Sequence, residues 1–169
     1  MDETATATSN SNEIDAPTSR KIYKGGCFCG NVTYQVIGPP ILSAYCHCTL
    51  CQRVNASPFI LSVHFPAASF SWSHAAPHES NMDPYAIHHK PWKVRWRCKN
   101  CGSVVASNNT KLDKWSIWGA QLERDSAGRI IGWDEVKPTA HIFYDTRLVD
   151  VADDLGKWTG YENESERIG

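Results

Sequence analysis

The stretch CHCTLCQ, residues 46–52, places three cysteines within six positions. Two cysteine pairs, CFC at 27–29 and CKNC at 98–101, account for the other four of the seven cysteines. Cysteines cluster in this way when they share a metal ion, because tetrahedral zinc with Zn–S bonds of about 2.3 Å needs sulfurs roughly 3.8 Å apart. Glycines flank both pairs, where a backbone that wraps a metal needs positive φ. The cysteine pattern therefore predicts a zinc-stabilised fold.

The seven cysteines divide naturally into a group of four and a group of three. Four thiolates complete a tetrahedral site, which is then structural, whereas three thiolates leave one position for water or substrate. The two pairs make up the expected closed group: Cys27, Cys29, Cys98 and Cys101. The contiguous cysteines make up the expected open group: Cys46, Cys48 and Cys51. Disulfides or free thiols are the alternative for the first group, and a redox thiol cluster or inert thiols for the second; iron stays open as the metal.

Composition limits the classes of partner. The 169 residues suit one domain with a tail, and 41% of them are apolar, enough for a hydrophobic core. The formal net charge of −1 gives no field that would attract nucleic acid or an acidic membrane. No stretch reaches the roughly 18 apolar residues of a membrane span, and no secretory signal is visible. We therefore expect a cytoplasmic protein without nucleic-acid or membrane partners, in a compartment that keeps thiols reduced.

Apolar and polar residues alternate in several short segments, which is the pattern of half-buried strands. The expected strands are 31–37, 41–45, 59–65, 93–98, 104–107, 115–118 and 140–144. Their shortness and spacing predict a mainly β fold of antiparallel strands. One or two short helices are expected, at 50–55 with Thr49 as the N-cap, and at 151–158. Residues 67–91 are expected to be loop-like.

Three regions are expected along the chain. Residues 1–19 are mostly small and polar and cannot bury enough apolar surface to order themselves, so we expect a flexible N-terminal tail. Residues 20–160 form the expected zinc domain. Residues 161–169 are polar and are expected to fray as a C-terminal tail.

Three segments together resemble one known family. GCFCGNVTY at 26–34, CHCTLCQ at 46–52 and CKNCG at 98–102 resemble the glutathione-dependent formaldehyde-activating enzyme family, also called the centromere protein V/Gfa domain. PTAHI at 138–142 also resembles that family's pattern of a proline, a histidine and an apolar residue. The resemblance covers about residues 20 to 160. It implies a β-tent fold with two zinc ions per chain, the closed cysteine group on the structural zinc and the open group on the second.

The resemblance also implies carbon–sulfur chemistry, which joins or parts glutathione and a small aldehyde through S-hydroxymethylglutathione. Glutathione would then be the co-substrate, and the open group would be the catalytic site. A thiol that takes the open position on zinc becomes a thiolate near neutral pH. Arg53, Arg95 and Arg97 are candidates for binding the carboxylates of glutathione. The alternative for the two arginines at 95 and 97, and for Lys93, is the solvated face of a strand.

Proton transfer needs a group that titrates near neutrality, and histidine is the usual choice. His47 lies between two expected ligands, and His141 lies in the last of the family-like segments. A packing or surface role is the alternative for each of them. Adjacent carboxylates occur at 134–135 and 153–154, and we expect both pairs to be solvated because neighbours in sequence rarely face each other.

Three functional hypotheses follow from the sequence. The first is a zinc-dependent carbon–sulfur lyase or synthase that acts on a small-molecule thiol and an electrophile. The second is a non-catalytic zinc-binding scaffold of the same fold. The third is a thiol-redox enzyme related to zinc-containing methionine sulfoxide reductases, which the absence of a lone cysteine disfavours. The sequence names neither the electrophile nor the oligomeric state.

Overall fold

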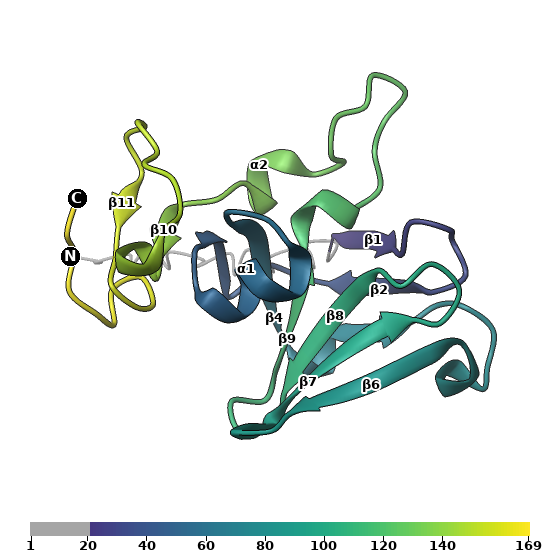
Figure 1. Ribbon diagram of the computed structural model, residues 1–169. Coiled ribbons are helices and arrows are strands. Elements are labelled where there is room, and N and C mark those ends of the chain that lie inside the picture. Colours follow the sequence, from purple (N-terminus) through teal and green to yellow (C-terminus); the bar gives the residue numbers. More distant parts are fainter. Residues whose placement is uncertain (1–20) are drawn as a thin grey trace, which may run out of the picture.

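The structure, a computed structural model that describes residues 21–169, is mainly β and is built from short strands. The expected tail at 1–19 lies outside the described residues. A small antiparallel sheet has the order β1-β2-β5, with β1 Ile22–Gly26, β2 Thr33–Ile37 and β5 Phe70–Trp72. A large sheet has the order β11-β10-β3-β4-β9-β8-β7-β6 (Figure 1). The predicted fold class, mainly β, is confirmed.

The strands of the large sheet are short, and some neighbours in the sheet are far apart along the chain, as β4 and β9 are. The strands are β3 Leu42–Cys46, β4 Ile60–Pro66, β6 Met82–Ile87, β7 Lys90–Cys98, β8 Val104–Asn109, β9 Lys114–Trp118, β10 Ala140–Ile142 and β11 Gly156–Lys157. The segment 67–91 was expected to be loop-like, but it contains β5, β6 and the start of β7. That expectation is wrong because Phe70 and Trp72 alternate over only three residues, and because β6 contains Pro84, a residue that sequence patterns disfavour in strands.

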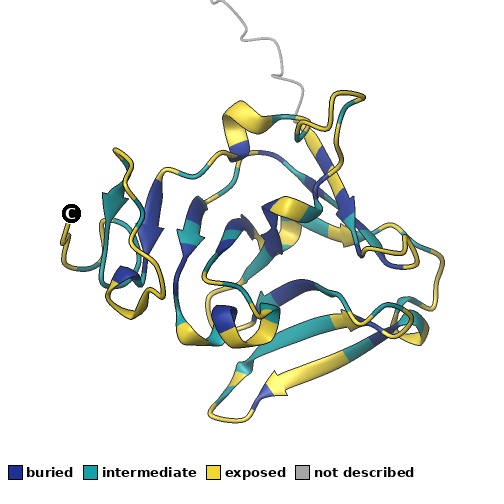
Figure 2. Cartoon of the chain, turned by 45° about the horizontal axis from the view of Figure 1, so that its top comes forward, coloured by how far each residue is buried: buried dark blue, intermediate teal, exposed yellow. Residues whose placement is uncertain are grey.

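Alternation along the strands gives the large sheet one apolar face and one polar face. Val63, Phe65 and Ile117 on β4 and β9 are fully buried in the main core. Tyr34 and Val36 of β2 belong to the same core, so the two sheets pack against each other through it (Figure 2). Each such buried side chain contributes about 1.5–3 kcal/mol. The opposite face of β4 and β9 is left for polar side chains, and it becomes the floor of the cavity described below.

The sequence predicted antiparallel strands, and this is wrong at one edge of the large sheet. β10 pairs in parallel with both β3 and β11. Parallel neighbours need a long crossover instead of a hairpin, and about a hundred residues separate β3 from β10 along the chain. The late segment therefore returns beside the strand that carries the first cysteine of the open group.

Helices are few and short. In the described residues, α1 spans Thr49–Asn55 and α2 spans Trp133–Val136. The 3₁₀ turns there are Ala67–Ser69, His78–Asn81, Gly119–Gln121 and Tyr144–Thr146. α1 was expected with Thr49 as its cap, but the N-cap is Cys48, whose sulfur accepts from the backbone N–H of Cys51. The helix predicted at 151–158 is wrong, since that segment holds β11 and follows the β10 edge.

The C-terminal segment, expected to fray, is hydrogen-bonded to its neighbours. The N–H of Lys157 donates to the carbonyl of Gly169 at 2.9 Å, and the N–H of Ile168 donates back to Lys157 at 2.7 Å. Among residues 21–169, no helix has the length and apolar character that crossing a bilayer requires.

Candidate metal centres and the adjoining cavity

The first cysteine group joins the small sheet to the large one. Cys27 and Cys29 follow β1, Cys98 ends β7, and Cys101 lies in the turn after it. The four sulfurs lie within 4.8 Å of one another, with Cys27 to Cys29 at 3.6 Å and Cys29 to Cys98 at 3.7 Å. These spacings match the roughly 3.8 Å of a tetrahedral four-sulfur site. The group therefore fits a coordinatively complete metal ion.

Two tight turns hold these cysteines in place. The N–H of Gly30 donates to the carbonyl of Cys27, and the N–H of Gly102 donates to the carbonyl of Cys98. Both glycines have positive φ, +82° and +74°, a conformation that side chains rarely adopt. The N–H of Val32 also donates to the Cys27 sulfur at 3.3 Å.

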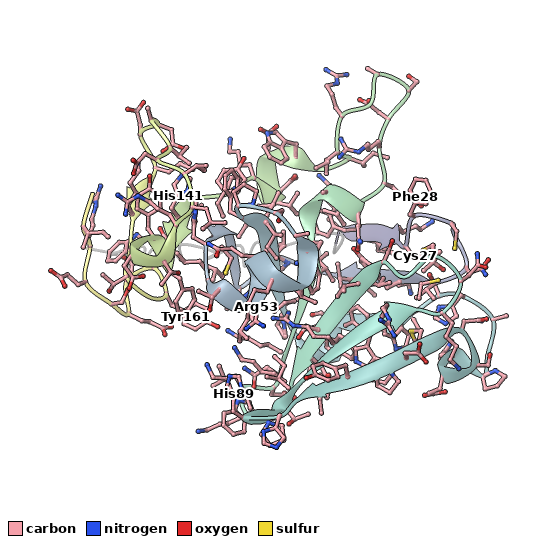
Figure 3. All side chains as sticks on the ribbon, in the orientation of Figure 1. Cys27, Phe28, Arg53, His89, His141 and Tyr161 are labelled. Atoms are coloured by element: carbon pink, nitrogen blue, oxygen red, sulfur yellow. The ribbon has the colours of Figure 1, made fainter. Side chains whose placement is uncertain are left out.

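The second cysteine group lies at the start of α1. Cys46 ends β3, Cys48 is the N-cap of α1, and Cys51 lies in its first turn. Their three sulfurs also lie within 4.8 Å of one another, and no fourth histidine, cysteine or carboxylate ligand among residues 21–169 joins them. The seven cysteines are thus gathered as four and three. Figure 3 places Cys27 far across the molecule from His141 and Tyr161, which lie on the side of the second group.

Three thiols this close cannot all ionise without a cation. Hydrogen bonds from Cys46 and Cys51, aided by the Cys51 N–H and the charge of Arg95, hold the pKa of Cys48 far below its usual range. The same contacts and burial raise the pKa of Cys46 well above its usual range. Without a metal, the trio therefore shares one thiolate at neutral pH. A divalent ion would stabilise all three thiolates at once, so the donor set fits a metal.

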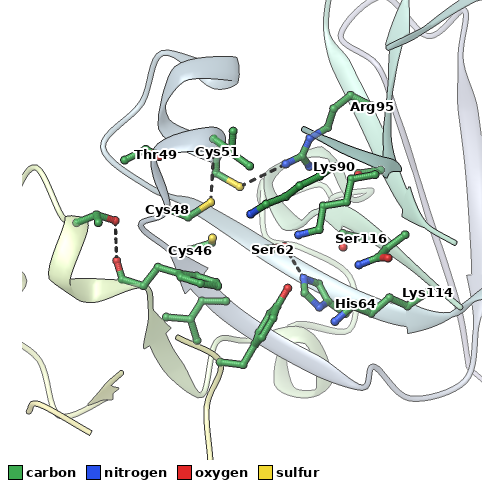
Figure 4. A pocket seen from close by; sticks show the side chains of 18 of the residues that line it. Cys46, Cys48, Thr49, Cys51, Ser62, His64, Lys90, Arg95, Lys114 and Ser116 are labelled. Carbon is green, nitrogen blue, oxygen red and sulfur yellow. Dashed lines mark hydrogen bonds between the residues drawn. The ribbon is translucent and has the colours of Figure 1, made fainter. Parts of the chain in front are cut away.

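The open group forms one wall of a cavity of about 270 Å³. Cationic side chains from β7 and β9 stand across from it, namely Lys90, Lys93, Arg95 and Lys114, against one acidic lining residue, Asp145. The guanidinium Nη2 of Arg95 lies 3.9 Å from the Cys51 sulfur (Figure 4). The cavity is therefore suited to an anionic molecule whose one end reaches the cysteines.

The polar face of the large sheet forms the cavity floor. Ser62 and His64 come from β4, Ser107 and Asn109 from β8, and Ser116 from β9. The Ser62 hydroxyl lies 3.0 Å from Nε2 of His64, while Nδ1 of His64 is buried without a partner. Burial, followed by the nearby cations, lowers the pKa of His64 to about 3, so its ring is neutral at pH 7.

The arginines expected from the sequence are distributed unevenly. Arg95 lines the cavity, as does Lys93 on the same strand. Arg97 instead forms an exposed ion pair with Asp83 at 3.4 Å. Arg53 lies in the last turn of α1 and lines a different hollow.

The two histidines expected near the chemistry are buried behind the cysteines and do not line the cavity. Nε2 of His47 lies 2.8 Å from Nδ1 of His141, and Nε2 of His141 lies 2.9 Å from Asp153. Burial first, and then the charges of neighbouring groups, lower the pKa of His47 to about 4. Asp153 is exposed, as expected, but its carboxylate also pairs with Lys157 at 3.1 Å, which the sequence did not indicate. The chain of contacts anchors the backbone between Cys46 and Cys48 to the β10–β11 edge.

Several residues that line the cavity were not predicted from the sequence. Lys90, Lys114, His64 and Tyr161 all line the cavity. A signal was present for some of them, because polar residues alternate with core residues in SVH at 62–64 and in KWSIW at 114–118. Tyr161 gave no such signal, since it lies in the segment expected to be a tail.

One comparison with known proteins agrees with the family expected from the cysteine segments. A family model described as "Glutathione-dependent formaldehyde-activating enzyme" matches residues 22–146. Among curated proteins, no relative matches at a significant level. A crystal structure of a Rhodobacter sphaeroides protein is 18% identical, with a TM-score of 0.48, and the alignment covers 63% of this chain and 96% of that one.

Proposed function

Because the chain belongs to the glutathione-dependent formaldehyde-activating enzyme family, we propose that it is a zinc-dependent carbon–sulfur lyase or synthase. Its substrates in this proposal are glutathione adducts of a small aldehyde or a related electrophile. The observation that carries the proposal is the open group of three cysteines at the wall of a cationic cavity. A purely structural metal site needs neither a missing fourth ligand nor an adjoining cavity.

Each cysteine group has a distinct role in the proposal. Cys27, Cys29, Cys98 and Cys101 hold a structural zinc, and Cys46, Cys48 and Cys51 hold a second zinc with an open position. A zinc ion bound there would lower the pKa of an incoming thiol, so that the thiol would lose its proton near neutral pH. Arg95, at 3.9 Å from the Cys51 sulfur, offsets part of the negative charge that three thiolates concentrate.

The protein's own groups serve the carbon–sulfur step. The glutathione sulfur adds to the carbonyl carbon, the carbonyl π electrons move to oxygen, and that oxygen takes up a proton to give a hydroxymethyl group. Tyr161 lines the cavity, and burial and then the cysteine charges raise its pKa to about 12. Its hydroxyl therefore keeps its proton at pH 7 and can donate a hydrogen bond to the developing oxyanion. Cleavage of the adduct is the same step in reverse.

A Cys48→Ser variant tests the proposal. We expect one zinc per chain instead of two, and a loss of at least 100-fold in the rate at which glutathione and formaldehyde exchange with their adduct, followed by NMR. Circular dichroism and the thermal midpoint serve as controls for folding. A folded variant with full turnover would refute the three-cysteine site, and a wild-type protein with two zinc ions and no turnover would favour the scaffold hypothesis.

A further inference from the structure

Two lysines of the cavity lie in one row of the large sheet. Lys93 of β7 pairs in register with Asn109 of β8, and Asn109 pairs with Lys114 of β9. Because all three residues line the cavity, their side chains share the polar face of the sheet. The register thus sets two ammonium groups on either side of an amide, at a place that the cysteines do not occupy.

Neither of these lysines is paired with a carboxylate among residues 21–169. Within the described part of the chain, neither Lys93 nor Lys114 has a carboxylate within 4 Å. Burial, and then neighbouring cations, lower the pKa of both lysines, although Cys48 and Cys51 act on Lys93, and Glu164 on Lys114, in the opposite direction. Lys114 also packs over the Tyr161 ring, 4.6 Å from its centroid. Partly buried like charges cost stability unless an anion joins them.

Hydrogen-bond donors on the floor complete the arrangement. Nδ1 of His64 is buried without a partner, and in the tautomer in which the Ser62 hydroxyl donates to Nε2, Nδ1 carries a proton that a ligand can accept. His64 is 5% exposed, so this donor is buried at the cavity floor. Asn109 uses Oδ1 to accept from the N–H groups of residues 111 and 112, which leaves its amide hydrogens for a ligand. The two lysines, His64 and Asn109 can all donate hydrogen bonds into the cavity. An anion with several acceptor oxygens would match this set of donors.

We propose that Lys93, Lys114 and His64 form a carboxylate-binding subsite of the cavity. The inference rests on the proposed function, since it takes the sulfur of the same molecule to lie at the three cysteines. The subsite then receives a carboxylate that lies several bonds away from that sulfur. The substrate class is a thiol, or a thiol adduct, that carries remote carboxylates, as glutathione does, and neutral small thiols are disfavoured.

Titration calorimetry with a blocked ligand tests the subsite without any reaction. S-methylglutathione keeps both carboxylates but has no free thiol, and its diester lacks both negative charges. We expect the zinc-loaded wild type to bind the acid at least tenfold more tightly than the diester, with a preference that weakens as salt is raised. Equal affinity for acid and diester, or no saturable binding of the acid, would overturn the subsite. This arm needs no variant.

A double variant and a matched control locate the effect. In Lys93→Gln/Lys114→Gln we expect at least tenfold weaker binding of the acid and little change for the diester. Lys111→Gln removes the same kind of charge from the exposed turn beside Lys114, outside the cavity lining, and should bind within twofold of wild type. Binding of the acid by a folded, zinc-loaded double variant within twofold of wild type would overturn the proposal.

Turnover measured on the same samples separates this inference from the proposed function. Lysine-dependent binding of S-methylglutathione in a protein that shows no turnover would support the subsite and refute the lyase. Turnover in the wild type, together with S-methylglutathione binding that is unchanged in the double variant, would support the lyase and refute the subsite.

Discussion

Asp153 is an exposed carboxylate that contacts the buried histidines behind the candidate site. It accepts from Nε2 of His141, which is fully buried and contacts His47. Asp153→Ala leaves that N–H without an acceptor, so we expect the free energy of unfolding to fall by about 1–3 kcal/mol in urea titrations. Asp154→Ala is the matched control at the neighbouring position, and it should change stability little. Equal effects of the two substitutions would show that the contact with His141 does not stabilise the fold.

His64 gives the protein a pH dependence whose sign follows from its pKa. The folded-state pKa of about 3 lies below the roughly 6.5 of an exposed histidine, so between these values the unfolded chain binds a proton that the folded chain does not. The free energy of unfolding contributed by His64 is therefore complete above pH 6.5 and is lost as the pH falls, by up to about 1.4 kcal/mol per unit. Cysteine protonation and metal loss affect every variant in the same range.

A pair of variants isolates that contribution. Between pH 6.5 and 5, His64→Gln should lose less stability than wild type in urea titrations, because Gln has no proton to bind. His88→Gln, in the exposed turn before β7, should follow the wild-type slope. An identical slope in His64→Gln and wild type would contradict the burial of a neutral imidazole at the cavity floor.

The sequence predicted those strands and helices that are determined by a local pattern of residues. The strand at 93–98 and the helix at 50–55 were predicted close to their observed positions, because alternation and a capping pattern are local signals. The parallel β10 edge was not, since nothing in Ala140–Ile142 itself says which strand will lie beside it. β11, two residues long, is too short for any pattern.

The same limit explains what was missed in the site. The cysteine groups could be assigned because each pair or triplet brings its sulfurs together with a local turn. Arg95 and Arg97 look alike in sequence, yet one lines the cavity and the other pairs with Asp83, and the pairing of β7 with β8 shifts register between Trp96 and Arg97. Asp153 acquires its buried partners only when β10 and β11 meet.

For the whole molecule, the closed cysteine group links parts of the chain that strand pairing does not join. Cys27 and Cys29 belong to the small sheet's first hairpin, and Cys98 ends β7 of the large sheet. We expect Cys98→Ser to lose one zinc ion and to lower the thermal midpoint by more than 10 °C, because metal binding there contributes directly to folding. Zinc content and thermal unfolding measure this.

Cys48→Ser is the control, because it makes the same substitution in the open group. Equal thermal midpoints for Cys98→Ser and Cys48→Ser would refute a structural role for the closed group.

The two-faced pairing of β4, β9, β8 and β7 also constrains how the sheet can assemble. Sliding one strand past its neighbour by a single residue would turn its serines, histidine or lysines into the space now filled by Val63, Phe65 and Ile117, and would push those apolar groups into water. A folding intermediate with misaligned strands is therefore destabilised in two ways, by buried polar groups on one face of the sheet and by exposed apolar groups on the other. The polar residues that shape the chamber thereby select the correct alignment while the chain is still folding, before any small molecule arrives.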